Sequence, residues 1–159
     1  MTNVMHYFRY AKPCDQDEII RLVKENSRWF SHLSDNHFIN KINNKECIYE
    51  NGVLITFKIL SNDFKLGTYV IKAGNTVLEQ LIKNKEKSNS DLVKHVFIKF
   101  LNCVSGYVYL AVNTQNYRAI NFYNNMNMEK VGKTKLDYKD DKSLFVEGYV
   151  YKSKKVITF

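Results

Sequence analysis

A segment in the second half of the chain passes directly from a strand pattern into a helical pattern. Residues 107–112 form an apolar run typical of a strand, residues 113–116 form a polar loop, and residues 117–125 have the spacing of an amphipathic helix. Further strand patterns follow at residues 129–136 and 145–152. A chain that alternates strands and helices in this way builds a sheet with helices packed on it. The segment therefore predicts an α/β fold.

Two helices are predicted near the start of the chain, after a first strand at residues 6–10. The first helix opens at residues 15–18, which have the Asx-x-x-Glu pattern of a capping box, and its apolar stripe runs on to residues 29–30. The second helix is capped by Ser34. Their apolar faces are expected to contribute to the core.

The middle of the chain is rich in strand patterns. Asn51 and Gly52 form a strong hairpin signal between two apolar runs. The strands predicted in this region are residues 47–50, 53–60, 65–72 and 76–82. A third helix opens at Ser90 and Asp91, which are good helix caps. Because no linker or repeat divides the chain, we expect a single α/β domain over residues 1–159 with a mixed sheet.

The composition is typical of a globular protein in water. Of the 159 residues, 45% are hydrophobic and 25% are charged, which excludes a disordered chain. The longest apolar runs are too short to span a bilayer, and the first residues lack the regions of a signal peptide. Cys14, Cys47 and Cys103 lie far apart, without the spacing of a disulfide framework or a zinc site. We therefore expect a cytoplasmic protein with no membrane partner and no metal.

The chain is basic, with 24 Lys and Arg against 16 Asp and Glu and a net charge of +8. A positive field attracts phosphates, whether on nucleic acid, on a nucleotide cofactor or on an anionic surface. Only four of the 24 are arginines, so most of the excess is lysine, which binds phosphate with less geometric specificity. The net charge leaves two alternatives open: the basic residues cluster on a surface that binds nucleic acid, or they are spread evenly over the protein.

The strand–loop–helix segment also carries a motif. The residues that follow the pattern N-x-x-A-x-x-F-Y after the strand are Asn116, Ala119, Phe122 and Tyr123. This pattern resembles motif B of the GNAT acyltransferase superfamily. The chain departs from it at Asn127, where glycine is usual, but asparagine is the least costly replacement for a left-handed glycine. The resemblance implies a mixed, mostly antiparallel sheet flanked by helices.

The resemblance implies acetyl-CoA, or another acyl-CoA, as the cofactor. The strand residues that would border it are Leu81, Ile82 and Lys83. The family's pyrophosphate loop, Q/R-x-x-G-x-G/A, corresponds to residues 85–90, where a diphosphate would meet N–H groups at a helix N-terminus. The other residues expected to bind the cofactor are Lys85, Lys87, Ser88, Asn89, Ser90, Asn116 and Tyr123. Serines replace both glycines of the loop, and serine resists the positive φ that glycine accepts.

The implied reaction is direct attack of an amine on the thioester carbonyl. It needs a base for the ammonium proton and a donor for the departing thiolate. Tyr123 stands where many family members carry that donor, and its ordinary pKa of about 10 suits a thiolate. Glu79 is the only carboxylate on its strand and is the expected base. Two alternatives stay open: by the family's usual spacing Thr76 faces the site in place of Glu79, or the base acts through water.

Three functions stay open at this point. The first is an N-acetyltransferase that modifies a small molecule, a peptide or a protein. The second is a GNAT-like enzyme that modifies bases of DNA or RNA, as some phage DNA-modification proteins do, supported by the charge and by aromatic residues interleaved with basic ones. The third is a non-catalytic binding module on the same scaffold, supported by the missing glycines. The sequence identifies neither the acceptor nor the oligomeric state, and a homodimer stays open.

Overall fold

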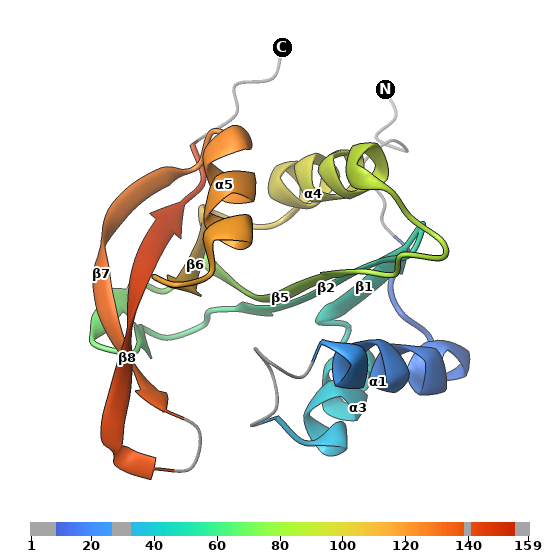
Figure 1. Ribbon diagram of the computed structural model, residues 1–159, viewed down its shortest axis with the longest axis horizontal. Coiled ribbons are helices and arrows are strands. Elements are labelled where there is room, and N and C mark those ends of the chain that lie inside the picture. Colours follow the sequence, from blue (N-terminus) through green and yellow to red (C-terminus); the bar gives the residue numbers. More distant parts are fainter. Residues whose placement is uncertain (1–8, 27–32, 139–140, 155–159) are drawn as a thin grey trace. The chain divides into compact units, whose positions relative to one another are not determined.

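The computed structural model describes residues 9–26, 33–138 and 141–154 (Figure 1). The helices are α1 (Gln16–Glu25), α3 (Asp35–Asn43), α4 (Ser90–Cys103) and α5 (Tyr117–Asn125), and a 3-10 turn covers Pro13–Asp15. The strands are β1 (Cys47–Glu50), β2 (Val53–Ile59), β3 (Phe64–Leu66), β4 (Tyr69–Ile71), β5 (Thr76–Lys83), β6 (Val108–Asn113), β7 (Glu129–Tyr138) and β8 (Asp141–Lys152). Of the strand predicted at residues 6–10 only Arg9 and Tyr10 are described, and Trp29 and Phe30 lie outside the described residues.

Six strands form one mixed sheet in the order β1-β2-β5-β6-β8-β7. β5 and β6 are parallel, whereas β1 and β2, β6 and β8, and β7 and β8 pair antiparallel. β3 and β4 form a separate two-stranded hairpin. The predicted α/β fold, with a mixed, mostly antiparallel sheet and flanking helices, is therefore confirmed.

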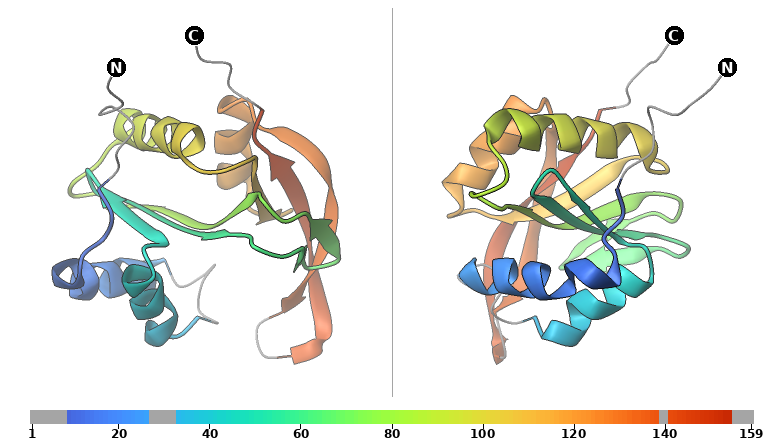
Figure 2. Two further views of the ribbon diagram at one scale, coloured as in Figure 1. Left: turned by 180° about the vertical axis from the view of Figure 1, so that it is seen from behind. Right: turned by 90° about the vertical axis from the view of Figure 1, so that its right-hand side faces the viewer.

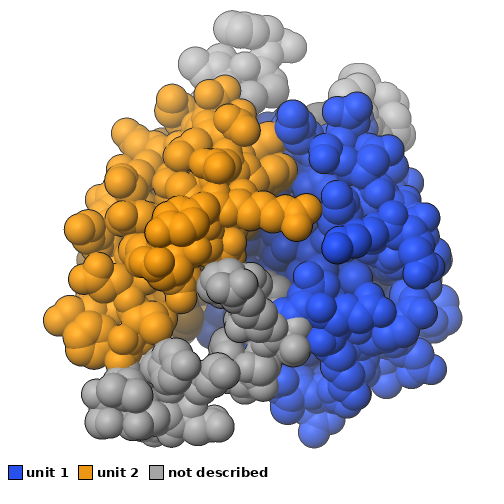
Figure 3. All heavy atoms as spheres, in the orientation of Figure 1, with its two compact units in different colours: residues 1–58, 78–103 blue, residues 59–77, 104–159 orange. Residues whose placement is uncertain are grey.

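The chain divides into two compact units (Figure 3). The first comprises Met1–Lys58 and Leu78–Cys103, and the second comprises Ile59–Val77 and Val104–Phe159. β5 contributes to both, because Thr76 and Val77 belong to the second unit and the rest of the strand belongs to the first. The single domain expected over residues 1–159 stays a prediction.

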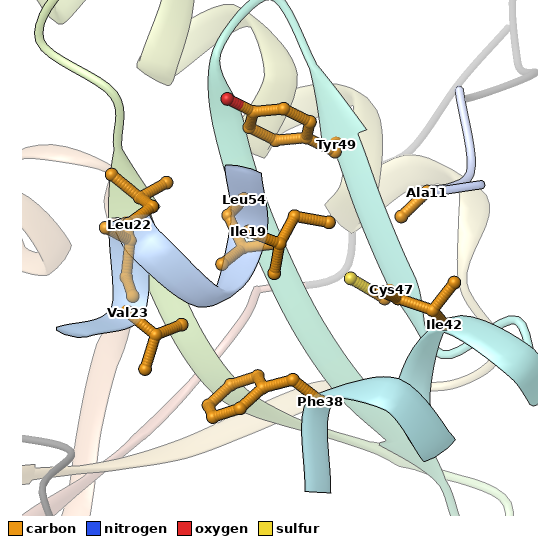
Figure 4. Packing of buried hydrophobic residues seen from close by; sticks show 10 residues of the cluster. Ala11, Ile19, Leu22, Val23, Phe38, Ile42, Cys47, Tyr49 and Leu54 are labelled. Atoms are coloured by element: carbon orange, nitrogen blue, oxygen red, sulfur yellow. The ribbon is translucent and has the colours of Figure 1, made fainter. Parts of the chain in front are cut away.

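In the first unit, helices cover both faces of β1, β2 and the later part of β5 (Figures 1 and 2). α1 and α3 lie on one face, over a core drawn in Figure 4. This core contains Ala11, Ile19, Leu22, Val23, Phe38, Ile42, Cys47, Tyr49, Leu54 and Ile82. On the other face Phe57 of β2 packs against Phe100 of α4, with ring centroids 5.3 Å apart. Each large apolar side chain buried in this way contributes about 1.5–3 kcal/mol.

In the second unit, the parallel pairing of β5 with β6 joins Thr76 to Val108 and Val77 to Tyr109. A small core of Leu60, Ile71 and Val77 lies beside the β3–β4 hairpin. α5 packs on the sheet through Tyr123, whose ring centroid lies 6.2 Å from that of Tyr151 on β8.

One predicted strand is wrong, because residues 65–72 form the β3–β4 hairpin and not a continuous strand. The turn is at Gly67, which has φ +63°, and a Cβ there would lie 2.3 Å from the Oγ1 of Thr134. Thr68 N donates to the same Oγ1 at 2.8 Å. The apolar and β-branched residues on both sides of Gly67 conceal the turn in the sequence.

Two predicted helix starts also differ in detail. The side chain of Asp15 does not cap α1; its carboxylate accepts from Lys12 N at 2.8 Å and from Arg9 at 3.0 Å. α4 begins at Ser90, but its cap is Asn89, whose Oδ1 accepts from Leu92 N at 2.9 Å. The predicted cap Ser34 is confirmed, since its side chain accepts from the N–H of His37.

Candidate functional site

An asparagine lies on each side of the motif helix α5. Asn116 is its N-cap, and its Oδ1 accepts from Ala119 N at 3.3 Å. This bond explains the N-x-x-A spacing, because a cap oxygen reaches the N–H two or three residues further on. Asn127, just beyond the helix, has φ +60°. The asparagine therefore adopts the left-handed conformation expected of the glycine that it replaces.

Tyr123 is the buried residue of α5, with 8% of its surface exposed. Its ring lies against Tyr151 and, at 5.5 Å, against Phe122. Burial raises the pKa of its phenol above the ordinary value. The shift makes the phenol a weaker acid than an exposed tyrosine, and its hydroxyl stays a neutral hydrogen-bond donor. That Tyr123 points into a cofactor cleft stays a prediction.

The glycine-free loop from Asn84 to Ser90 precedes α4 in the first unit. None of these residues, all of which the structure describes, has a positive φ. The serines at positions 88 and 90 therefore cause no backbone strain, and glycine is not needed for this loop shape. The replacement of glycine by serine therefore leaves the loop unstrained.

Asn84 shapes this loop. It is buried, and its N–H donates to Gly52 O at 2.7 Å. Its own carbonyl accepts from Lys87 N at 3.1 Å and from Ser88 N at 2.9 Å, and its Oδ1 accepts from Glu86 N at 3.1 Å. The N–H of Ser88, predicted to face a diphosphate, is thus bound inside the loop. The N–H groups of Asn89 and Ser90 meet no acceptor within the described part of the chain.

The two lysines of the loop differ in their surroundings. Lys85 is exposed. The ammonium of Lys87 lies 2.8 Å from Glu18 Oε1 of α1. The hydrogen bond from Lys87, followed by one from Tyr49, lowers the pKa of Glu18. The carboxylate therefore stays ionised at neutral pH, and its stabilising contribution is lost only as the pH falls through this lowered pKa.

Glu79, the predicted base, forms an ion pair with Lys41 of α3. Lys41 is buried, and its ammonium also donates to Phe57 O at 2.8 Å and lies 3.5 Å from Glu46. The carboxylate of Glu79 thus compensates a buried cation, and its role as a base stays a prediction. The alternative residue, Thr76, is buried and donates its hydroxyl to Ser105 O at 3.0 Å.

The strand residues predicted to border the cofactor alternate in exposure. Ile82 belongs to the core of the first unit, while Leu81 and Lys83 are half-buried. Their contact with a cofactor stays a prediction.

A pocket of about 690 Å³ lies along α1 and α3. Its charged lining residues are Asp17, Arg21, Lys24, Glu25 and Asp35. Only Lys24 and Asp35 form an ion pair among them, at 3.8 Å. Three carboxylates against two cations suit a cationic ligand better than an anionic one.

The comparisons with solved structures agree on one fold. The chain is similar to a GNAT-family acetyltransferase from Streptococcus agalactiae, with a TM-score of 0.69 and 14% identity over 95% of this chain and 99% of that one. The chain has the GNAT acetyltransferase fold. It is also similar to Arabidopsis thaliana NAA60 in complex with acetyl-CoA, with a TM-score of 0.65 and 15% identity over 92% of this chain and 98% of that one. No protein-family model and no curated protein matches the sequence.

Sequence reasoning missed several residues that organise this GNAT fold. Lys41 lies on a helix and resembles any solvent-exposed lysine in the sequence. Asn84 Nδ2 donates a hydrogen bond to the Tyr49 hydroxyl at 3.0 Å, although the two residues are 35 positions apart in the sequence. Asn84 is one of several polar residues in and after its strand, so the sequence gives only a weak signal for it.

None of the helices in residues 9–26, 33–138 and 141–154 is long and apolar enough to cross a membrane. The same residues contain no group of three or more His, Cys, Asp or Glu side chains that could hold a metal ion.

Proposed function

We propose that the protein is an acyl-CoA-dependent N-acyltransferase that moves an acetyl group to an amine. The observation that carries this proposal is the GNAT fold over 95% of the chain, with the motif helix α5 capped by Asn116. Further support comes from the loop before α4, whose exposed Lys85 and unbonded Asn89 and Ser90 N–H groups suit a diphosphate. The carboxylates of the α1–α3 pocket suit an amine acceptor, which is a cation in water.

In this reaction the amine nitrogen bonds to the thioester carbonyl carbon, and the carbon–sulfur bond breaks. The amine loses a proton to a base, and the departing thiolate takes one. Tyr123 is proposed to donate to the sulfur, because it stands at the family's donor position in the motif of α5; burial raises the pKa of its phenol, which makes it a weaker acid than an exposed tyrosine. Glu79, or a base acting through water, is proposed to take the proton of the amine.

The direct test is calorimetric titration of the purified protein with acetyl-CoA, followed by an assay against a panel of amines, peptides and nucleic acids. Saturable binding and acetyl transfer support the proposal. Binding without transfer to any acceptor, or no binding at all, would instead favour the non-catalytic module on the same scaffold.

Lys85→Glu is expected to weaken acetyl-CoA binding by about tenfold or more, because a hydrogen bond to a charged group is worth about 1.5–3 kcal/mol. The measurement is the Kd by calorimetry. Lys65→Glu is the matched control, since Lys65 is also an exposed lysine and lies in the β3–β4 hairpin. An equal loss in both variants would show that only net charge matters, and no loss in Lys85→Glu would place the diphosphate elsewhere.

A second candidate acceptor is single-stranded nucleic acid, favoured by cation–π pairs in the second unit. Lys130 lies 4.3 Å from the ring centroid of Tyr149, Lys152 lies 4.0 Å from that of Tyr107, and Lys135 lies 4.6 Å from that of Phe145. Lysines beside aromatic rings combine phosphate attraction with base stacking.

This candidate predicts salt-dependent binding of single-stranded DNA. Replacing Lys130 and Lys135 by glutamine should reduce the slope of log K against log salt by about 1.4, since each phosphate contact contributes about 0.7. Fluorescence anisotropy at several salt concentrations measures the slope. An unchanged slope, or no DNA binding by the wild type, would remove nucleic acid as the acceptor.

A further inference from the structure

In the loop before α4, Lys87 already binds an anionic group of the protein itself, the carboxylate of Glu18. The ammonium of Lys87 lies 2.8 Å from Glu18 Oε1. The side chain of Lys87 is 55% exposed and that of Glu18 is 26% exposed. The pair is therefore accessible to solvent and to a ligand. An exposed pair of this kind is weak enough to exchange partners.

The carboxylate of Glu18 is fixed from its other side by the loop's own network. Tyr49 donates its hydroxyl to Glu18 Oε2, and Asn84 Nδ2 donates to the Tyr49 hydroxyl at 3.0 Å. Asn84 in turn accepts the N–H groups of Glu86, Lys87 and Ser88. A single hydrogen-bonded chain thus runs from α1 through β1 to the loop, and it holds Glu18 next to Lys87.

The loop itself is supported by the turn between β1 and β2. A Cβ on Gly52 would lie 2.8 Å from the Cβ of Lys87, and Gly52 O accepts from Asn84 N. The backbone of Lys87 is therefore fixed, while its long side chain is free to change partner. An incoming anion must take the ammonium from Glu18 or bind beside a negative carboxylate.

We propose that Glu18 acts as a built-in competitor for anions at Lys87, so that the loop selects a diphosphate over anions of lower charge. The proposal rests on the proposed acyl-CoA function and concerns the selectivity of the same loop. A singly charged anion gains little binding free energy when it replaces, at Lys87, a carboxylate of equal charge. A diphosphate carries more charge and offers oxygens to Lys87, Lys85 and the N–H groups of Asn89 and Ser90 together. Glu18 keeps its hydrogen bond from Tyr49 when Lys87 leaves it.

The test is Glu18→Gln, which keeps the shape of the side chain and an oxygen acceptor for the Tyr49 hydroxyl. Inorganic pyrophosphate and chloride are the probes, and acetyl-CoA is titrated in parallel. We expect pyrophosphate to bind about threefold to tenfold more tightly to the variant, and chloride to compete more strongly for the site. Glu129→Gln is the matched control, because Glu129 is an exposed carboxylate of β7 and its replacement removes the same charge. Its effect should be less than twofold.

A second variant links the effect to Lys87. In Glu18→Gln combined with Lys87→Gln, the gain in pyrophosphate affinity should disappear. If Glu18→Gln binds pyrophosphate no more tightly than the wild type, including the case in which neither binds it, the proposal is wrong. If the gain appears for pyrophosphate while acetyl-CoA binds to none of the variants, Glu18 is the competitor and the acyl-CoA function is the part that fails.

Discussion

Replacing Tyr123 by phenylalanine is expected to lower kcat by about 10²–10⁴-fold and to leave the affinity for acetyl-CoA nearly unchanged. The substitution removes one hydroxyl and keeps the ring that packs on Tyr151. If the phenol gives its proton to the departing sulfur, only the transition state loses an interaction. The measurement is steady-state kinetics with an acceptor found by screening, together with the Kd for acetyl-CoA.

The control for this variant is Tyr117→Phe on the same helix. Tyr117 is 63% exposed, so its hydroxyl is expected to contribute little. Equal losses of binding and turnover in Tyr123→Phe would show that the phenol positions the cofactor and does not donate a proton. A variant that works at full speed would exclude Tyr123 as the acid and would leave the fold unaffected.

Local signals in the sequence predicted the elements well. α5 covers the predicted residues 117–125 because Asn116 caps its first turn, and both partners of that contact lie within three residues. The turn at Asn51 and Gly52 has positive φ at both residues, as the hairpin signal requires. Where the partners of a contact are close in sequence, residue types and spacing are enough to predict it.

The candidate site was less predictable because its contacts join distant residues. Glu18 was expected to close a capping box, but it binds Lys87, which is 69 positions away. Glu79 was expected to act as a base, and nothing in the strand pattern indicated its ion pair with Lys41 of α3. Residues 85–90 were compared with a glycine-rich pattern, but Asn84 gives their loop a shape that needs no glycine. Such pairings depend on packing, which a linear pattern does not contain.

The pairing of Lys41 with Glu79 leads to the largest expected effect on stability. The side chain of Lys41 is 9% exposed, and its ammonium binds Glu79 and donates to Phe57 O at 2.8 Å. Lys41→Met would leave the carboxylate of Glu79 and the carbonyl of Phe57 without this partner. Removing one member of a buried ion pair typically costs about 3–5 kcal/mol, and we expect a loss near the lower end because Glu79 is 24% exposed.

Urea unfolding of Lys41→Met, Glu79→Gln and the double variant measures this effect. The double variant should recover part of the stability lost in Lys41→Met, because it removes the charge of Glu79, whereas Glu46 and the carbonyl of Phe57 still lack the ammonium. Lys24→Met, on the exposed surface of α1, is the control and should change the free energy of unfolding by less than about 0.5 kcal/mol. If Lys41→Met were as stable as the wild type, the ion pair would not hold Glu79. The carboxylate would then be free to serve as the base, and Glu79→Gln should lower turnover without lowering stability.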